Sequence, residues 1–346
     1  MTNELIDRVS FRMFKPYTTT GIGSLPHKDP EEACRLVLET FDIPFWPQLP
    51  KLSFRESMIP QFSEGIPFIK IDDQRETIWV ERNGSNALTR FYENYSEDMT
   101  VSISEDYAKG LHTFIRLIKN KRFTSLKGQV TGPLTFTLGL KDSEGKPIYF
   151  DEELREISLM VLKAKIRWQI EILKPYTDTI IIFVDEPILS ALGSTSYLGV
   201  IPEEALRLLR EISDTVRHAG GIPGIHCCSK ADWSLAINSG TTIISFDAYG
   251  YTDTISMYPE EFTQFLRSGG YLAWGIVPTT ESIIEENLDS IRKRFDDSID
   301  RLSKSIPGDL LCSKILLTPS CGTGSMNIEH AVKVFALLKQ LKETIS

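Results

Sequence analysis

The sequence predicts an α/β protein: a single (β/α)8 TIM barrel with an insertion between its second and third strands. Eight short apolar segments rich in valine and isoleucine recur along the chain, and most precede a segment with helical periodicity. Buried strands that alternate with helices are typical of a parallel sheet, and eight of them favour closure into a barrel. An open doubly wound sheet has the same periodicity and remains the alternative.

The predicted strands span residues 18–24, 43–49, 125–130, 179–187, 222–228, 241–247, 271–277 and 314–320. The clearest predicted helices span residues 152–173 and 202–221, the second with a proline at its start and glycines at its end. We interpret residues 1–346 as one catalytic barrel domain.

The segment at about 50–124 is too long for a simple connection and is interpreted as an insertion. Residues 66–82 predict a hairpin within it, and residues 103–121 predict a helix. An insertion of this size beside one barrel mouth is expected to shape a site.

Composition limits the expected partners and location. Lysine and arginine number 38 against 47 aspartates and glutamates, a net charge of −9, and no basic block occurs. We therefore expect neither nucleic acid nor a membrane surface as the main partner. Residues 1–14 lack the apolar core of a signal peptide, and five cysteines do not form a disulfide framework. These features predict a cytoplasmic protein, in which clustered cysteines more often serve metal binding or catalysis.

Polar residues stand at or just after the carboxyl ends of five predicted strands. They are Ser24, Asp185, His226, Cys228, Asp247 and Cys321. In a parallel barrel these ends converge on one face, where the active sites of this fold lie. The plain alternative is that small polar residues favour loop starts, which explains any one of them better than it explains the set.

The His226-x-Cys228 spacing predicts a metal site. Successive side chains of an extended segment point to opposite sides, so His226 and Cys228 face together while Cys227 turns away. An imidazole and a thiolate suit Zn²⁺, and Asp247 and Cys321 are the candidates that would complete four ligands. A nucleophilic Cys–His pair is disfavoured, because residues so close on one strand seldom have the attacking geometry.

The other cysteines and histidines are expected to have structural roles. His-x-Cys alone is a weak motif, since buried cysteine is common as a small apolar residue. That role is assigned to Cys34 and Cys312. Surface or satisfied positions are expected for the remaining histidines: His27, His112, His218 and His330.

Six motifs in order, GIGSLP, VTGPLTF, VDEPIL, IHCC, FDAYG and PSCG, resemble the catalytic barrel of cobalamin-independent methionine synthase and its relatives. The resemblance runs from about residue 18 to the C-terminus, and the wider superfamily includes uroporphyrinogen decarboxylase and zinc-dependent corrinoid methyltransferases. It implies zinc bound by His226, Cys228, Asp247 and Cys321. It also implies that Ile22, Gly23 and Ser24 hold the amino-acid substrate, and that Asp185 holds the ammonium group of homocysteine.

The chain departs from the folate-dependent members of this family. The family carboxylate ligand is glutamate, and Asp247 is one methylene shorter. Gly139 stands where these enzymes place a tryptophan against folate, and Glu281 where they place a proton-donating histidine. Their second barrel has no counterpart, and their homocysteine-binding glutamate falls in residues 51–58, where no equivalent is assigned. The resemblance is closer to single-barrel "core" methionine synthases, which are thought to take the methyl group from a corrinoid.

We therefore predict a zinc-dependent methyltransferase that moves a methyl group from methylcobalamin, or from a methylated corrinoid protein, to homocysteine. Three alternatives keep a related site: methyltetrahydrofolate as donor, another thiol such as coenzyme M as acceptor, and a non-enzymatic zinc barrel that docks a corrinoid protein. A decarboxylase relative would not need the metal ligands.

Overall fold

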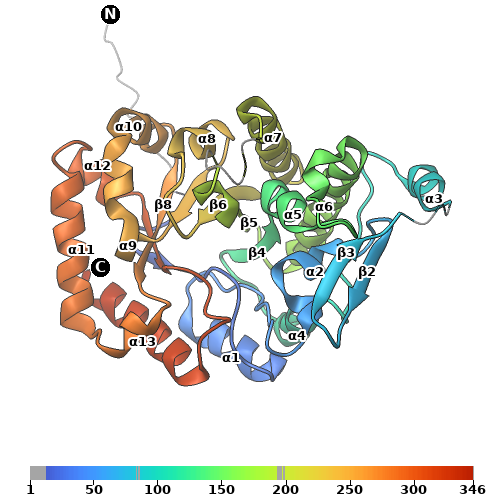
Figure 1. Ribbon diagram of the computed structural model, residues 1–346. Helices are drawn as coiled ribbons and strands as arrows, with labels where there is room; N and C mark the ends of the chain where they lie inside the picture. Colours follow the sequence, from blue (N-terminus) through green and yellow to red (C-terminus); the bar gives the residue numbers. More distant parts are fainter. Residues whose placement is uncertain (1–12, 83, 85, 193–196, 198, 346) are drawn as a thin grey trace, which may run out of the picture.

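The computed structural model describes residues 13–82, 84, 86–192, 197 and 199–345. Seven parallel strands form one curled sheet in the order β1-β9-β8-β7-β6-β5-β4, with helices around it (Figure 1). The strands are β1 (Thr18–Thr19), β4 (Leu126–Thr131), β5 (Ile180–Asp185), β6 (Ile222–Cys227), β7 (Ile243–Phe246), β8 (Tyr271–Val277) and β9 (Ile315–Pro319). The predicted parallel α/β barrel architecture is confirmed.

The predicted second strand lies between the two edges of this sheet. Its backbone makes isolated parallel bridges, Ser24 with Gln48 towards β1 and Phe45 with Lys127 towards β4. Residues 43–49 therefore close the barrel without forming a regular strand. The physical reason is that residues 44 and 47 are prolines, which have no N–H to donate to a ladder.

The strands are buried on both faces, which accounts for their continuous apolar character. One apolar cluster fills the barrel interior and includes Phe183, Tyr271 and Leu316. Phe14 packs edge-to-face on Tyr271, with 5.2 Å between ring centroids. Because Tyr271 begins β8, the apolar filling lies towards the amino-terminal ends of the strands. The carboxyl ends are left for polar groups.

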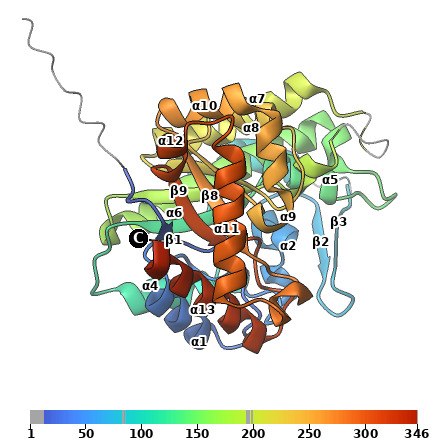
Figure 2. The same ribbon diagram turned by 90° about the vertical axis from the view of Figure 1, so that its left-hand side faces the viewer.

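Helices cover the outside of the sheet (Figures 1 and 2). They include α1 (Pro30–Thr40), α5 (Pro133–Gly139), α6 (Glu152–Leu173), α7 (Pro202–His218), α8 (Trp233–Asn238), α9 (Ala248–Tyr251), α10 (Pro259–Arg267), α11 (Leu288–Leu302), α12 (Gly308–Cys312) and α13 (Ile328–Ile345). The bounds of α6 match the predicted helix, and the Asp151 side chain caps it by accepting from the Leu154 N–H. Helix α7 begins at Pro202 as predicted and ends before Gly220, whose φ of +88° suits glycine. In the described parts of the chain, no helix combines the length and apolarity needed to cross a bilayer.

The insertion contains the predicted hairpin. Strands β2 (Ile69–Asp72) and β3 (Thr77–Val80) pair antiparallel and, with α3 (Ala87–Asn94), project to one side of the barrel (Figure 1). The predicted helix at 103–121 is shorter in the structure, α4 (Lys109–Ile118). Helix α2 (Met58–Ser63) lies beside the carboxyl end of β4, where the Thr131 hydroxyl donates to the Met58 carbonyl at 2.6 Å.

Helix α4 fastens the insertion to the barrel-closing segment. The buried Glu56 carboxylate accepts from the Leu49 N–H at 3.0 Å and from the Lys109 N–H at 2.9 Å. A methyl group on Gly110 would lie 1.9 Å from the Pro47 carbonyl oxygen. The close backbone approach of α4 to residues 43–49 therefore requires glycine.

We predict that Gly110→Ala lowers the free energy of unfolding by about 1–3 kcal/mol, because the backbone must separate at this contact. Alanine by itself favours a helix over glycine by about 1 kcal/mol, so the sign of the change is diagnostic. Urea unfolding measures it. The neighbouring exposed Lys109→Ala is the control and should change stability by less than about 0.5 kcal/mol. A more stable Gly110→Ala protein would contradict the close approach.

Candidate metal centre

The register of the sheet brings predicted site residues from neighbouring strands to one level. Asp185 at the end of β5 pairs with His226 in β6, and His226 pairs with Ser245 in β7. Inward-facing side chains at paired positions are neighbours. The three side chains therefore meet at the carboxyl ends of the strands, as the barrel fold implies.

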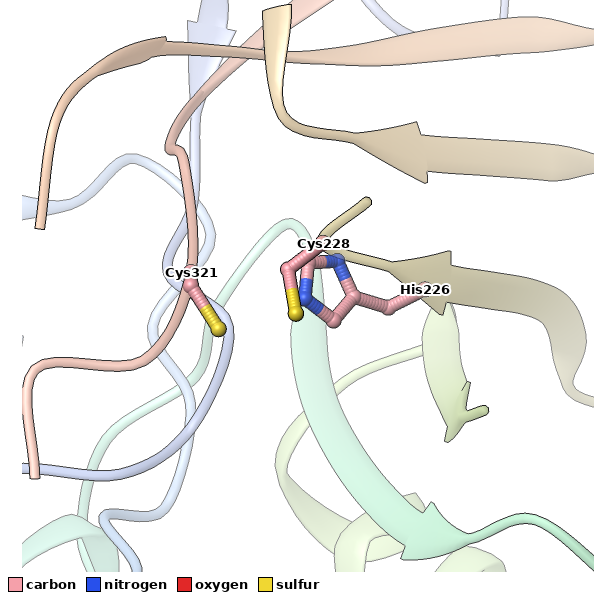
Figure 3. A group of neighbouring side chains, drawn as sticks. All are labelled: His226, Cys228 and Cys321. Carbon is pink, nitrogen blue, oxygen red and sulfur yellow. The ribbon is translucent and has the colours of Figure 1, made fainter. Parts of the chain in front are cut away.

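His226, Cys228 and Cys321 form a compact group of three potential ligands. Their ligand atoms all lie within 4.8 Å of one another. His226 and Cys228 come from the end of β6, and Cys321 comes from the loop after β9. Figure 3 shows the two sulfur atoms directed towards the same space beside the imidazole. Residues about 95 positions apart in sequence thus meet at the face where the carboxyl ends of the strands converge.

The His226 ring is oriented by a residue that the sequence analysis missed. Its Nδ1 lies 2.9 Å from the hydroxyl of the buried Ser245, whereas its Nε2 is buried and, among the described residues, has no hydrogen-bond partner. If Nδ1 carries the proton and donates to Ser245, Nε2 presents a lone pair. Such a second contact commonly orients a metal-binding histidine. Ser245 could have been found from its place two residues before Asp247, on the same strand face.

The two thiols differ in acidity. The neighbouring Cys321 side chain and the nearby His226 lower the pKa of Cys228. The Cys228 side chain, together with burial, raises the pKa of Cys321. The two sulfurs therefore lie close enough for each to act on the pKa of the other. A bound metal ion would hold both as thiolates, because coordinated thiols are deprotonated.

The remaining cysteines lie away from this group. Cys227 is fully buried on the opposite face of β6, and burial raises its pKa to about 12. Cys34 is fully buried in α1, with its thiol 3.4 Å from the Gly110 carbonyl, and Cys312 is half-buried at the end of α12. These positions suit structural roles.

Asp247, the predicted fourth ligand, lies outside the compact group. Its Oδ1 accepts from the Gly250 N–H at 2.8 Å and so caps α9. Burial raises its pKa to about 6, and the charges of Cys228 and His226 also act on it, which places it near the centre. Its role as a ligand stays a prediction. Binding a metal through Oδ1 would compete with the helix cap.

The donor chemistry of the compact group fits zinc. Two sulfurs and one imidazole nitrogen are the soft and intermediate donors that Zn²⁺ prefers. The buried Nε2 of His226 has no hydrogen-bond partner among the described residues. Burying it in this way costs free energy unless a ligand binds to it. The three side chains would hold the ion, and a fourth position is left for Asp247 or for a ligand from solution.

Asp185 has a free carboxylate oxygen in the same place. The side chain is 8% exposed, and its Oδ1 is buried with no hydrogen-bond partner in the described part of the chain. Burial raises the pKa of Asp185, while His226 and Lys127 oppose that shift. The next residue, Glu186, differs: its oxygens accept from the Leu134 N–H at 2.9 Å and the Thr135 N–H at 2.8 Å. In the Asp-Glu-Pro motif the glutamate therefore holds α5 and the aspartate is available to a ligand.

The predicted substrate segment 22–24 is tied to the loop that carries Cys321. The Ser24 carbonyl accepts from the Thr323 N–H at 2.8 Å, and the Ser24 hydroxyl accepts from the Gly324 N–H at 3.2 Å. The Ile22 carbonyl accepts from the Lys127 ammonium at 2.6 Å. Gly23 between them packs against Gln129. The segment thus has a defined position beside the loop that carries Cys321.

The structure also places the residues at which the sequence differs from the folate-dependent methionine synthases that it resembles. Gly139 ends α5, and a methyl group there would lie 2.4 Å from Cδ1 of Ile59 in α2. Glu281 is exposed at the start of a short 3-10 helix, Glu281–Ile284. Glu56, the glutamate of residues 51–58, is buried against backbone N–H groups, and burial raises its pKa to about 7. Its carboxylate oxygens are therefore already paired within the fold.

One of the other histidines differs from expectation. The His112 Nε2 lies 2.8 Å from the Ile103 carbonyl, His218 is exposed and His330 is half-buried. His27 is buried, and its Nδ1 has no partner among the described residues. Burial lowers the pKa of His27, which favours the neutral ring. The expectation of a surface or satisfied histidine is wrong for His27.

Two solved structures have a similar fold. A B12-independent methionine synthase from Shewanella sp. W3-18-1, in complex with selenomethionine, is 14% identical with a TM-score of 0.58; the match covers 95% of this chain and 98% of that chain. A methyltransferase from Methanosarcina mazei is 13% identical with a TM-score of 0.54, covering 96% of this chain and 95% of that chain. No protein-family model and no curated protein matches the chain. At these identities the likeness establishes the fold, a barrel of the type seen in these two proteins.

We predict about one zinc ion per chain, largely lost in Cys228→Ser and in Cys321→Ser, because each substitution removes a thiolate from the group of three. Metal analysis of the purified proteins by mass spectrometry measures it. Cys227→Ser is the matched control and should retain the metal, since this sulfur lies on the other face of β6. Equal loss in all three variants would show that the metal is bound elsewhere or by Cys227.

Proposed function

We propose that the protein is a zinc-dependent methyltransferase that transfers a methyl group to the thiol of L-homocysteine and so forms methionine. The proposal rests on two kinds of buried polar group that lack partners among the described residues and lie side by side at the carboxyl ends of the strands. A buried histidine nitrogen stands with two cysteine sulfurs, and the free oxygen of Asp185 lies on the neighbouring strand. The first group suits a metal, and the second suits an ammonium group.

The donor set favours sulfur chemistry over hydrolysis. A zinc ion bound here would lower the pKa of a substrate thiol and keep its sulfur as a nucleophilic thiolate. Two cysteinates alone would neutralise the charge of the zinc ion, and a carboxylate such as Asp247, if it joined them, would bring the site to a formal charge of −1. Either charge disfavours activation of water. The substrate sulfur would attack the methyl carbon in line: the carbon–sulfur bond forms, and the bond to the donor breaks with its electron pair left on the donor.

The remaining groups orient an amino acid. Asp185 would accept hydrogen bonds from the substrate ammonium, and residues 22–24 would hold the rest of the amino-acid backbone. Holding the two reactants in the correct orientation removes much of the activation free energy of a bimolecular transfer. Coenzyme M has no ammonium group and would leave Asp185 unpaired, so homocysteine is the better acceptor.

The proposed donor is methylcobalamin or a methylated corrinoid protein. A reduced corrinoid leaves without needing a proton, which suits a site with the exposed Glu281 in place of a proton-donating histidine. The helix end at Gly139 offers no aromatic side chain to a folate ring. The second candidate donor is methyltetrahydrofolate, because the Shewanella protein is described as B12-independent.

A purely structural zinc barrel that docks a corrinoid protein is the non-enzymatic rival. It requires four protein ligands in a closed site. Three residues form the compact group, while Asp247 is engaged as a helix cap. This arrangement favours a centre that admits a ligand from solution, as an enzyme requires.

We predict that Asp185→Asn weakens homocysteine binding by roughly tenfold to over a hundredfold and leaves zinc content unchanged. The substitution removes a charge-assisted hydrogen bond, typically about 1.5–3 kcal/mol. Calorimetric titration with homocysteine and metal analysis of the same preparation measure both. Loss of zinc in this variant would mean that Asp185 is a ligand or holds the site together.

We predict methionine formation from homocysteine and methylcobalamin, and none from methyltetrahydrofolate. The assay is anoxic, because the reduced corrinoid is readily oxidised, and follows both methionine and corrinoid absorbance. Turnover with the folate donor would overturn the donor assignment and keep the acceptor. With zinc bound, absence of transfer from either donor would point to another thiol.

A further inference from the structure

A lysine is buried inside the barrel directly below the candidate site. Lys127 in β4 is 0% exposed. Its ammonium donates to the Ile22 carbonyl at 2.6 Å and to the Gln129 side-chain oxygen at 3.3 Å. It also lies 4.6 Å from the ring centroid of Phe183 and 5.2 Å from that of Phe45. Burying a cation is costly unless it is paired, so these contacts compensate an expensive placement.

The contacts of Lys127 hold the segment assigned to the substrate. The hydrogen bond to Ile22 fixes this segment from inside the barrel. The next inward residue of β4, Gln129, packs against Gly23, where an added methyl group would lie 3.0 Å from its Cδ. Gln129 itself is held by its amide, which donates to the Trp46 carbonyl at 3.0 Å. Together, the Lys127 and Gln129 side chains support residues 22–24 from inside the barrel.

Residues 22–24 are also attached, on their other side, to the loop that carries Cys321. Ser24 is hydrogen-bonded to Thr323 and Gly324, two and three residues after Cys321. A continuous chain of contacts therefore runs from Lys127 through residues 22–24 to the loop of a candidate metal ligand. The charge of Lys127 also acts on Asp185 on the adjacent strand.

We propose that Lys127 is the positioning residue of this site: through the Ile22 carbonyl it sets where residues 22–24 stand relative to Cys321 and Asp185, and thereby sets the affinity for an amino-acid thiol. The part that concerns affinity rests on the proposed function. Lys127 is fully buried, so it does not touch the ligand and acts through the segment and through its charge on Asp185.

The chain supplies a matched control. Lys165 in α6 is also 0% exposed, and its ammonium donates to a single backbone carbonyl, that of Ser102, at 3.2 Å. Burial lowers the pKa of both lysines. Methionine at either position keeps the length of the stem and removes the charge and the donor. Only Lys127→Met severs a contact with residues 22–24.

The experiment compares Lys127→Met and Lys165→Met, both loaded with zinc. Hydrogen exchange should rise about tenfold or more in peptides covering residues 18–26 and 320–326 of Lys127→Met, and should stay at the wild-type rate there in Lys165→Met. The dissociation constant and KM for homocysteine should rise about tenfold in Lys127→Met, for the loss of one charged hydrogen bond, with kcat within about twofold and zinc content unchanged.

Unchanged exchange in residues 18–26 of Lys127→Met would overturn the positioning role. So would an unchanged homocysteine affinity together with a fall in Tm equal to that of Lys165→Met. If Lys127→Met does not fold, Lys127→Gln serves, because it keeps a polar group but is one bond shorter towards the Ile22 carbonyl. Failure of the wild-type protein to bind homocysteine would refute the proposed function instead, and the exchange comparison would still decide the role of Lys127.

Discussion

The alignment of β5, β6 and β7 decides which side chains can meet at the barrel mouth. Asp185, His226 and Ser245 occupy paired positions in three successive strands, so they stand side by side. A slip of one residue would turn each of them to the outer face of the sheet, among the helices. The apolar interior below them, with Phe183 and Leu316, keeps the register because its side chains fit only one face. The candidate site therefore depends on the packing of the barrel core.

Hydrogen bonding distinguishes the buried polar groups with a structural role from the candidate functional ones. Glu56 and Glu186 are fully buried, and backbone N–H groups satisfy their oxygens. The Asp185 oxygen and the His226 nitrogen are buried without partners in the described residues. Leaving such a group unpaired costs roughly 1–3 kcal/mol, so nothing in stability favours it. Two of these groups on adjacent strands are best explained by ligands that complete them.

Closure of the barrel connects the insertion to the site. Residues 43–49 span the gap between β1 and β4, but their prolines limit them to isolated bridges. Other contacts supply the missing attachment: Glu56 on the Leu49 N–H, the close approach of Gly110, and the Trp46 indole, which donates to the buried Gln169 at 3.0 Å. The insertion thus stabilises the wall of the barrel on which residues 22–24 rest, while α2 lies at the mouth beside β4.

The sequence by itself determined the parallel α/β barrel, because the apolar strand segments and their helices are local patterns. It also determined that Cys227 turns away from His226 and Cys228, since side chains alternate along any strand. Only the tertiary structure decided that Cys321 reaches these two residues, that Ser245 orients His226, and that Lys127 supports residues 22–24 from within. It also showed that Asp247, which was predicted from the sequence only as a metal ligand, caps α9. These contacts join residues from different strands, and no local pattern encodes the distance between strands that meet only when the sheet curls.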